Sequence, residues 1–212
     1  MYDKQLIFVH PPKCAGTSIR VILRNHFGHP AWLPPDNNNV KKYGYATGKQ
    51  EFEVHEHAGH YTMSEYIDWY TKKNGSFVRS DYYIVGVCRN PFDRMVSMYH
   101  HCKTHRGYKN SFEQFLMTND LFDQLPRPTL FEYFAHQSSL LIDDIIHQET
   151  IQRDFDKVAQ KLNIDNYILP REQHQTQRKD SDYRVMYNQK TIDRVMELCK
   201  QDIEYFGYKF GE

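Results

Sequence analysis

The stretch FVHPPKCAGTSIR, Phe8–Arg20, runs from apolar residues through a cluster of Pro, Lys, Gly, Thr and Ser into a helical pattern. The continuous apolar residues of Gln5–His10 predict a buried strand. Apolar residues spaced for one helix face then predict a helix capped by Thr17 or Ser18. A turn from a strand into a helix brings backbone N–H groups and the positive helix end to one place, which suits a phosphate-like anion. Gly16 would allow close approach of the backbone to such a ligand.

Lys13 precedes the glycine of this loop, whereas in the P-loop of nucleotide hydrolases the order is Gly, then Lys, then Ser or Thr. Lys13 supplies a mobile cation, and two hydroxyl groups follow it. An ordinary strand-to-helix turn with a surface lysine is the alternative for this loop taken alone.

A second loop repeats the design in VGVCRNPFDRMVSMYHH. The apolar run Tyr82–Cys88 predicts a strand, and Phe92–His101 predicts a helix with an apolar stripe that is more typical of a core than of a cofactor site. Arg89, between them, can bind a phosphate in a bidentate manner, and Ser97 can donate from the helix. An ion-paired Arg89 and a Ser97 without function are the alternative. Two such sites at strand ends of one sheet point to a ligand with two separated phosphates.

Strands and helices alternate along the rest of the chain, which predicts an α/β fold with a central parallel sheet flanked by helices. No repeat or linker interrupts the chain, so we expect one domain, 1–212. The further helices expected begin at Thr62 or Ser64 and end at Tyr70, or span residues 111–117, 130–134, 150–162 and 191–204. The further strands expected span residues 51–55, 144–147 and 167–169.

The composition limits the possible partners and compartments. The 212 residues carry 27 Lys and Arg against 27 Asp and Glu, a net charge of zero, so no surface-wide field for nucleic acid is expected. The four cysteines form no CxxC pair and predict free thiols in a reducing compartment. No stretch is apolar enough to span a membrane, and the polar start does not resemble a secretory signal. These features predict a soluble, cytoplasmic protein.

The segment VHEHAGHYTMSE contains three histidines, His55, His57 and His60. Histidine suits general base catalysis near neutral pH. Any one of them could instead be structural, and the triple could suggest zinc, although the sequence identifies no fourth ligand or open water position.

Taken together, these motifs resemble those of the sulfotransferases that use 3′-phosphoadenosine 5′-phosphosulfate (PAPS). The most similar branch is the carbohydrate sulfotransferases that include the heparan 2-O-sulfating enzymes. The matching segments are PKCAGTS, EHAGHYTMSEY, RNPFDRMVS, HQETIQRDFDKVAQKLNI and the closing HQTQRKDSDYR with DIEYFGYKF, in order over nearly the whole chain.

The resemblance implies roles for particular residues. The first loop would hold the 5′-phosphosulfate, and Arg89 and Ser97 would hold the 3′-phosphate. His60 is the favoured base and His57 the second choice. Glu149 matches the family's acidic position, where a structural hydrogen bond is expected. The residues implied in cofactor binding are Lys13, Cys14, Ala15, Gly16, Thr17, Ser18, Arg89, Ser97, Thr176 and Arg178.

The implied reaction is in-line transfer of a sulfuryl group from PAPS to a hydroxyl acceptor, above all on a carbohydrate, leaving adenosine 3′,5′-bisphosphate (PAP). Lys13 would meet the charge that develops on the leaving phosphate, without a metal ion. No acidic Mg²⁺ ligand follows the strand that ends at Cys88, which counts against a kinase. A small-molecule P-loop kinase and a non-catalytic module that binds a nucleotide or glycan are the alternatives.

Overall fold

The computed structural model describes residues 5–27, 60–118, 121, 129–170 and 182–212. Within them a parallel sheet has the strand order β1 (Gln5–Val9), β2 (Tyr82–Cys88) and β5 (Asp144–His147). Every residue of β2 is buried, because it lies between two strands and is covered on both faces. The strands predicted at the start, at 82–88 and at 144–147 are confirmed.

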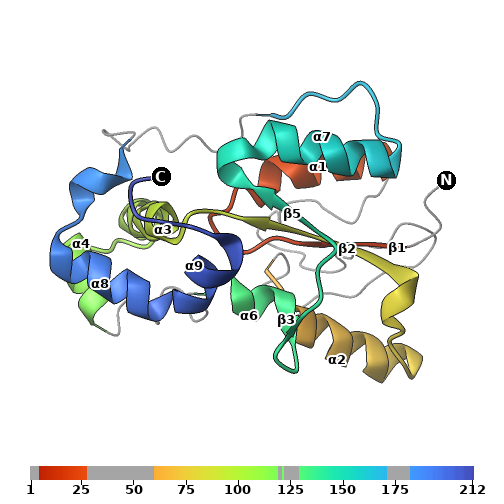
Figure 1. Cartoon of the computed structure of the whole chain (residues 1–212), viewed down its shortest axis with the longest axis horizontal. Helices are drawn as coiled ribbons and strands as arrows, with labels where there is room; N and C mark the ends of the chain where they lie inside the picture. The colour runs from red at the N-terminus through yellow and green to blue at the C-terminus, as the bar shows by residue number, and fades with distance from the viewer. Residues whose placement is uncertain (1–4, 28–59, 119–120, 122–128, 171–181) are drawn as a thin grey trace.

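Helices cover both faces of the sheet (Figure 1). Helices α1 (Gly16–Phe27) and α7 (Ile151–Leu162) lie on one face, and α2 (Met63–Asn74) and α6 (Phe131–Phe134) lie on the other. Their apolar sides and the strands form one hydrophobic core. The α/β architecture predicted from the alternating pattern is confirmed.

A second hydrophobic core lies beyond the carboxyl ends of the strands, on the left in Figure 1. It is built around α3 (Pro91–His105), whose apolar stripe is buried as the sequence predicts. The elements that join α3 in this region are α4 (Phe112–Met117), the 3₁₀ turn η3 (Tyr183–Met186), α8 (Gln189–Leu198) and α9 (Lys200–Phe206). The short elements η1 (Arg79–Asp81), β3 (Ala135–His136), β4 (Ser139–Leu140) and η2 (Gln148–Thr150) complete the described part.

The prediction of a strand at Tyr167–Leu169 is wrong. The segment lacks a neighbouring strand among the described residues and runs as an irregular chain. Its apolar residues still alternate in burial: the Tyr167 ring packs edge-on against Phe155 at 4.9 Å, while Ile168 is 88% exposed. The predicted strand at 51–55 falls outside the described residues.

The single closing helix predicted at 191–204 is instead two helices. The chain leaves helical geometry at Cys199, where φ is −107° and ψ is 27°. The break directs the Asp202 carboxylate to the N-terminus of α6, where it accepts hydrogen bonds from the backbone N–H groups of Leu130 at 2.7 Å and Phe131 at 2.8 Å.

No helix among the described residues is long and apolar enough to cross a membrane.

Gly86, in the centre of β2, is required by close packing. A Cβ atom there would lie 2.4 Å from Ile142 Cδ1 and 2.8 Å from Phe134 Cε1. We expect Gly86→Ala to lower the free energy of unfolding by about 1–3 kcal/mol, because the added methyl group overpacks the core. Urea denaturation measures this change.

The matched control adds Ile142→Val, which removes the atom nearest to the new methyl group. The double variant should recover part of the stability lost in Gly86→Ala. Strict additivity of the two single substitutions would contradict the proposed steric cause.

Candidate active site

The loop between β1 and α1 has an unusual backbone. Lys13 has a φ of 67° and Ala15 a φ of 62°, both in the left-handed region that residues other than glycine rarely adopt. Such strained residues cluster at ligand sites, and left-handed residues in a turn can gather N–H groups into an anion-binding concavity. Helix α1 begins at Gly16, so the predicted caps Thr17 and Ser18 lie inside its first turn instead.

Gly16 is needed here because a side chain packs directly over it. A Cβ atom at this position would lie 2.4 Å from the Cβ of His10. The ring of His10 is buried and its Nε2 lies 3.4 Å from Nη1 of Arg20. Burial, followed by the nearby His60 and Arg20, lowers the pKa of His10 well below its usual value. The imidazole of His10 is therefore a neutral group that packs against Gly16 of the loop.

Two arginines at the start of α3 hold the loop from the other side. Nη1 of Arg89 donates to the Lys13 carbonyl at 3.0 Å, and Nε of Arg94 donates to the Pro12 carbonyl at 3.0 Å. Arg94 is fully buried, and its guanidinium lies 5.9 Å from the centre of the Tyr133 ring. These bonds bring the two predicted loops into direct contact.

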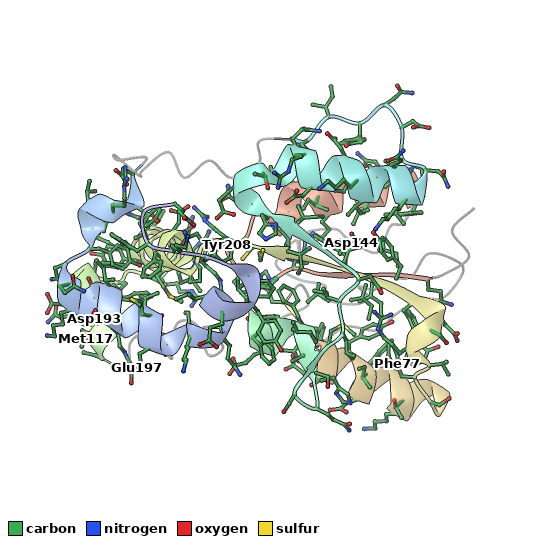
Figure 2. All side chains as sticks on the ribbon, in the orientation of Figure 1. Phe77, Met117, Asp144, Asp193, Glu197 and Tyr208 are labelled. Atoms are coloured by element: carbon green, nitrogen blue, oxygen red, sulfur yellow. The ribbon has the colours of Figure 1, made fainter. Side chains whose placement is uncertain are left out.

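Arg89 lies where the sequence predicts it, but it also has an ion-pair partner. Its Nε and Nη2 donate to one carboxylate oxygen of Asp93 at 3.0 and 2.6 Å. Ser97 lies two turns further along α3 and is buried. The N–H of Asn90 donates to Glu149 at 2.6 Å, which fits the structural role expected for that carboxylate. Tyr208, labelled in Figure 2, donates to the other Glu149 oxygen at 3.4 Å.

The side chain of Cys14 is part of the hydrophobic core and does not face the loop's outer side. Its Sγ lies 3.7 Å from the Pro12 carbonyl, and burial raises the pKa of the thiol to about 11. The predicted contact of Cys14 with a ligand would therefore have to come from its backbone.

His60 is held in one tautomer by a backbone contact. Its Nδ1 lies 2.8 Å from the carbonyl oxygen of His10, and because a carbonyl can only accept, Nδ1 carries the proton. The other nitrogen, Nε2, is then left with a free lone pair, as a general base requires. The capping box of Thr62 and Glu65 fixes the start of α2 directly after this histidine.

The electrostatic surroundings keep His60 neutral. The residue is exposed, but desolvation of its ring by the surrounding protein lowers the pKa of His60 to about 4. The hydrogen bond to the His10 carbonyl opposes this shift, and the positive charges of Arg20, Arg94 and Lys13 add to it. Lys13 is subject to the same kind of effect: burial and then Arg89 lower the pKa of its ammonium to about 8. The charge of Lys13 is therefore one of those that lower the pKa of His60.

The structure brings together Lys13, the first turn of α1, Arg89 and His60. Of the remaining predicted residues, His55, His57, Thr176 and Arg178 lie outside the described residues. Sequence reasoning missed the packing of His10 against Gly16, its contact with His60, and the bond of Arg94 to the loop, which only the folded chain shows. The second arginine of RNPFDR was the available signal for Arg94. In the described ranges, no three His, Cys, Asp or Glu residues are grouped so as to hold a metal ion.

Comparisons with known proteins define the class. The model of the sulfotransferase family matches residues 2–209, so the chain belongs to this family of enzymes. A crystal structure of a sulfotransferase from Alicyclobacillus acidocaldarius aligns with a TM-score of 0.40 and 14% sequence identity, covering 93% of this chain and 96% of that chain. A sequence search of curated proteins found no match.

The contact between His60 and His10 predicts a measurable tautomer. In ¹⁵N-edited NMR spectra, His60 should be the Nδ1–H form at neutral pH and should take up a proton only near pH 4. His60→Gln assigns the signal by its disappearance. An Nε2–H tautomer, or protonation at pH 6.5 or above, would contradict the geometry.

Proposed function

We propose that this sulfotransferase transfers the sulfuryl group of PAPS to a hydroxyl group of a carbohydrate, with His60 as the general base. The observation that carries the proposal is the hydrogen bond from His60 Nδ1 to the His10 carbonyl. This bond leaves a neutral imidazole next to His10, where the loop that the sequence motif assigns to the phosphosulfate begins. Lys13 of the same loop is among the charges that act on His60.

The acceptor oxygen attacks sulfur and gives its proton to Nε2 of His60. The bond between sulfur and the bridging oxygen breaks in line with the attack, and PAP leaves with the electron pair. Lys13 meets the charge that develops on the bridging oxygen, together with N–H groups of the first turn of α1.

The two ends of the donor would bind at different loops. The 5′-phosphosulfate would lie at the loop that ends in Gly16, Thr17 and Ser18, and the 3′-phosphate at Arg89 and Ser97. The first-turn position of Thr17 and Ser18 supports the assignment, since hydroxyl and N–H donors there lie at the positive end of α1. Thr176 and Arg178 are proposed to cover the nucleotide, as the resemblance implies.

A carbohydrate acceptor rests on the likeness of the motifs to the branch that includes the heparan 2-O-sulfating enzymes. A non-catalytic binding module would bind the nucleotide without turnover. Donor binding and turnover therefore need separate measurements.

Calorimetric titration with PAP, run against ATP with Mg²⁺, tests the donor site. We expect binding of PAP that does not depend on metal ions and that weakens at least tenfold in Arg89→Ala, because a charged hydrogen-bonding partner of the phosphate is lost. The charge-matched control is Arg79→Ala. Arg79 lies just before β2 and forms an ion pair with Asp143, and the variant should bind PAP normally. Binding of ATP with Mg²⁺ but not of PAP would overturn the proposal.

Lys13 should matter more for rate than for nucleotide affinity. We expect Lys13→Ala to lower kcat by about 10²–10³-fold, because the developing charge loses its cation, while PAP affinity falls by less than about tenfold. Release of PAP from PAPS over a panel of glycan acceptors measures turnover. Lys190→Ala, whose ammonium pairs with Glu113 on α4, is the control. An unchanged kcat in Lys13→Ala would refute the assigned role.

The pH profile gives a second check. The pKa of Lys13 is lowered to about 8, and its protonated form is the active one, so kcat/KM should fall as pH rises through about 8. His60 acts when unprotonated, so the acid limb should fall only as pH drops through about 4. Lys13→Arg, which stays charged, should remove the alkaline limb.

A further inference from the structure

A fully buried arginine lies directly against the first loop. Arg94 has an exposed fraction of 0%, and its Nε donates to the carbonyl oxygen of Pro12 at 3.0 Å. A buried guanidinium is costly unless its charge and its N–H groups have partners. Because Arg94 has no surface open to a ligand, any effect of its side chain on a bound donor must pass through the groups that it contacts.

Two helices fix the position of this guanidinium. In the first turn of α3, the N–H of Arg94 donates to the Asn90 carbonyl at 2.8 Å, and the Asn90 side chain caps the helix by accepting from the N–H of Phe92 at 3.0 Å. On α6, the buried ring of Tyr133 has its centre 5.9 Å from the guanidinium carbon. The Pro12 carbonyl therefore meets a donor whose own place is already set.

The backbone that follows Pro12 needs such support. Lys13 and Ala15 have φ angles of 67° and 62°, in a region that is unfavourable for residues other than glycine. The Pro12 carbonyl and the N–H of Lys13 belong to one trans peptide group, so a bond that fixes the oxygen also fixes the direction of the hydrogen. A loop binds its ligand only in the fraction of molecules that have the competent shape, and the apparent affinity falls with that fraction.

We propose that Arg94 is a positioning residue for the 5′-phosphosulfate. It acts through the Pro12 carbonyl to hold the loop in the conformation that binds this end of the donor, and it makes no contact with the donor itself. The inference rests on the proposed function. Arg89, by contrast, is partly exposed and is proposed to meet the 3′-phosphate directly. Loss of the Arg94 side chain should therefore affect the two ends of the donor unequally.

Two nucleotides separate these ends. PAP and adenosine 3′-phosphate share the 3′ end, and only PAP places a phosphate at the first loop. The ratio of the adenosine 3′-phosphate Kd to the PAP Kd thus measures what this loop contributes. We expect Arg94→Met to lower the ratio about tenfold, because the loop loses the bond that holds it, while the affinity for adenosine 3′-phosphate stays within about threefold. Calorimetric titration measures both constants.

Arg94→Gln distinguishes the hydrogen bond from the charge. The amide nitrogen of Gln lies as many bonds from Cα as Nε of Arg does, so it can donate to the same carbonyl without a charge. This variant should keep the ratio within about threefold of the wild-type value. An equal loss in Arg94→Gln and Arg94→Met would assign the effect to the charge and overturn the proposal. An unchanged ratio in Arg94→Met, or an equal loss of affinity for both nucleotides, would also overturn it.

The matched control is Arg194→Met. Nε of Arg194 on α8 also donates to a backbone carbonyl, that of Leu116 at 3.4 Å, but within the second core. Its ratio should stay within about twofold of the wild-type value. Arg89→Ala should weaken the binding of adenosine 3′-phosphate, which verifies that this nucleotide reports the 3′ site.

Thermal melting shows whether each variant folds. If Arg94→Met does not fold, Arg94→Lys takes its place, because it keeps the charge but carries its nitrogen one bond further from Cα. It should lower the ratio at least about threefold, and an unchanged ratio would overturn this inference alone. Failure of the wild type to bind PAP would overturn the proposed function and this inference together.

Discussion

The hydrogen bond from buried Arg94 to the Pro12 carbonyl is the contact on which the site depends. The loop contains two non-glycine residues in the left-handed region, Lys13 and Ala15, each at a cost of about 1–3 kcal/mol. Such a conformation persists only when surrounding groups hold it. Arg94 and Arg89 do so by fixing two successive carbonyls, so the shape of the first loop is determined by a helix that begins about 80 residues later in the sequence, at Pro91.

The same bonds orient the peptide groups. In a trans peptide the N–H points away from the C=O, so carbonyls directed at the arginines turn the N–H groups of Lys13 and Cys14 to the opposite side. The carbonyl of His10, just before the loop, is in turn taken by His60. Backbone oxygens thus face protein donors, while backbone hydrogens remain for an anion. One short segment therefore positions both the N–H groups proposed to bind the anion and the proposed base.

The sequence predicts the elements whose signals are local. The predicted bounds of strand β2 agree with the structure, because a strand buried on both faces is continuously apolar. The segment Tyr167–Leu169 carries the alternation of a strand, but a strand also needs a partner, which no local pattern reveals. The motif before α2 singles out His60 as the proposed base, whereas the bond of Arg94 to the Pro12 carbonyl is a product of the fold that no local pattern reveals.

The low pKa of His60 has a consequence for the proposed chemistry. A base with a pKa of about 4 is weak. Desolvation of the His60 ring is the largest cause of this low pKa, and the positive charges of Arg20, Arg94 and Lys13 lower it further. A phosphosulfate bound at the loop would offset these positive charges, and the pKa of His60 would rise toward its usual value. The base would then be strongest when the donor is present. Lys13, which is proposed to meet the donor, also lowers the pKa of the proposed base in the donor's absence, so one cation would link donor binding to activation of the acceptor hydroxyl.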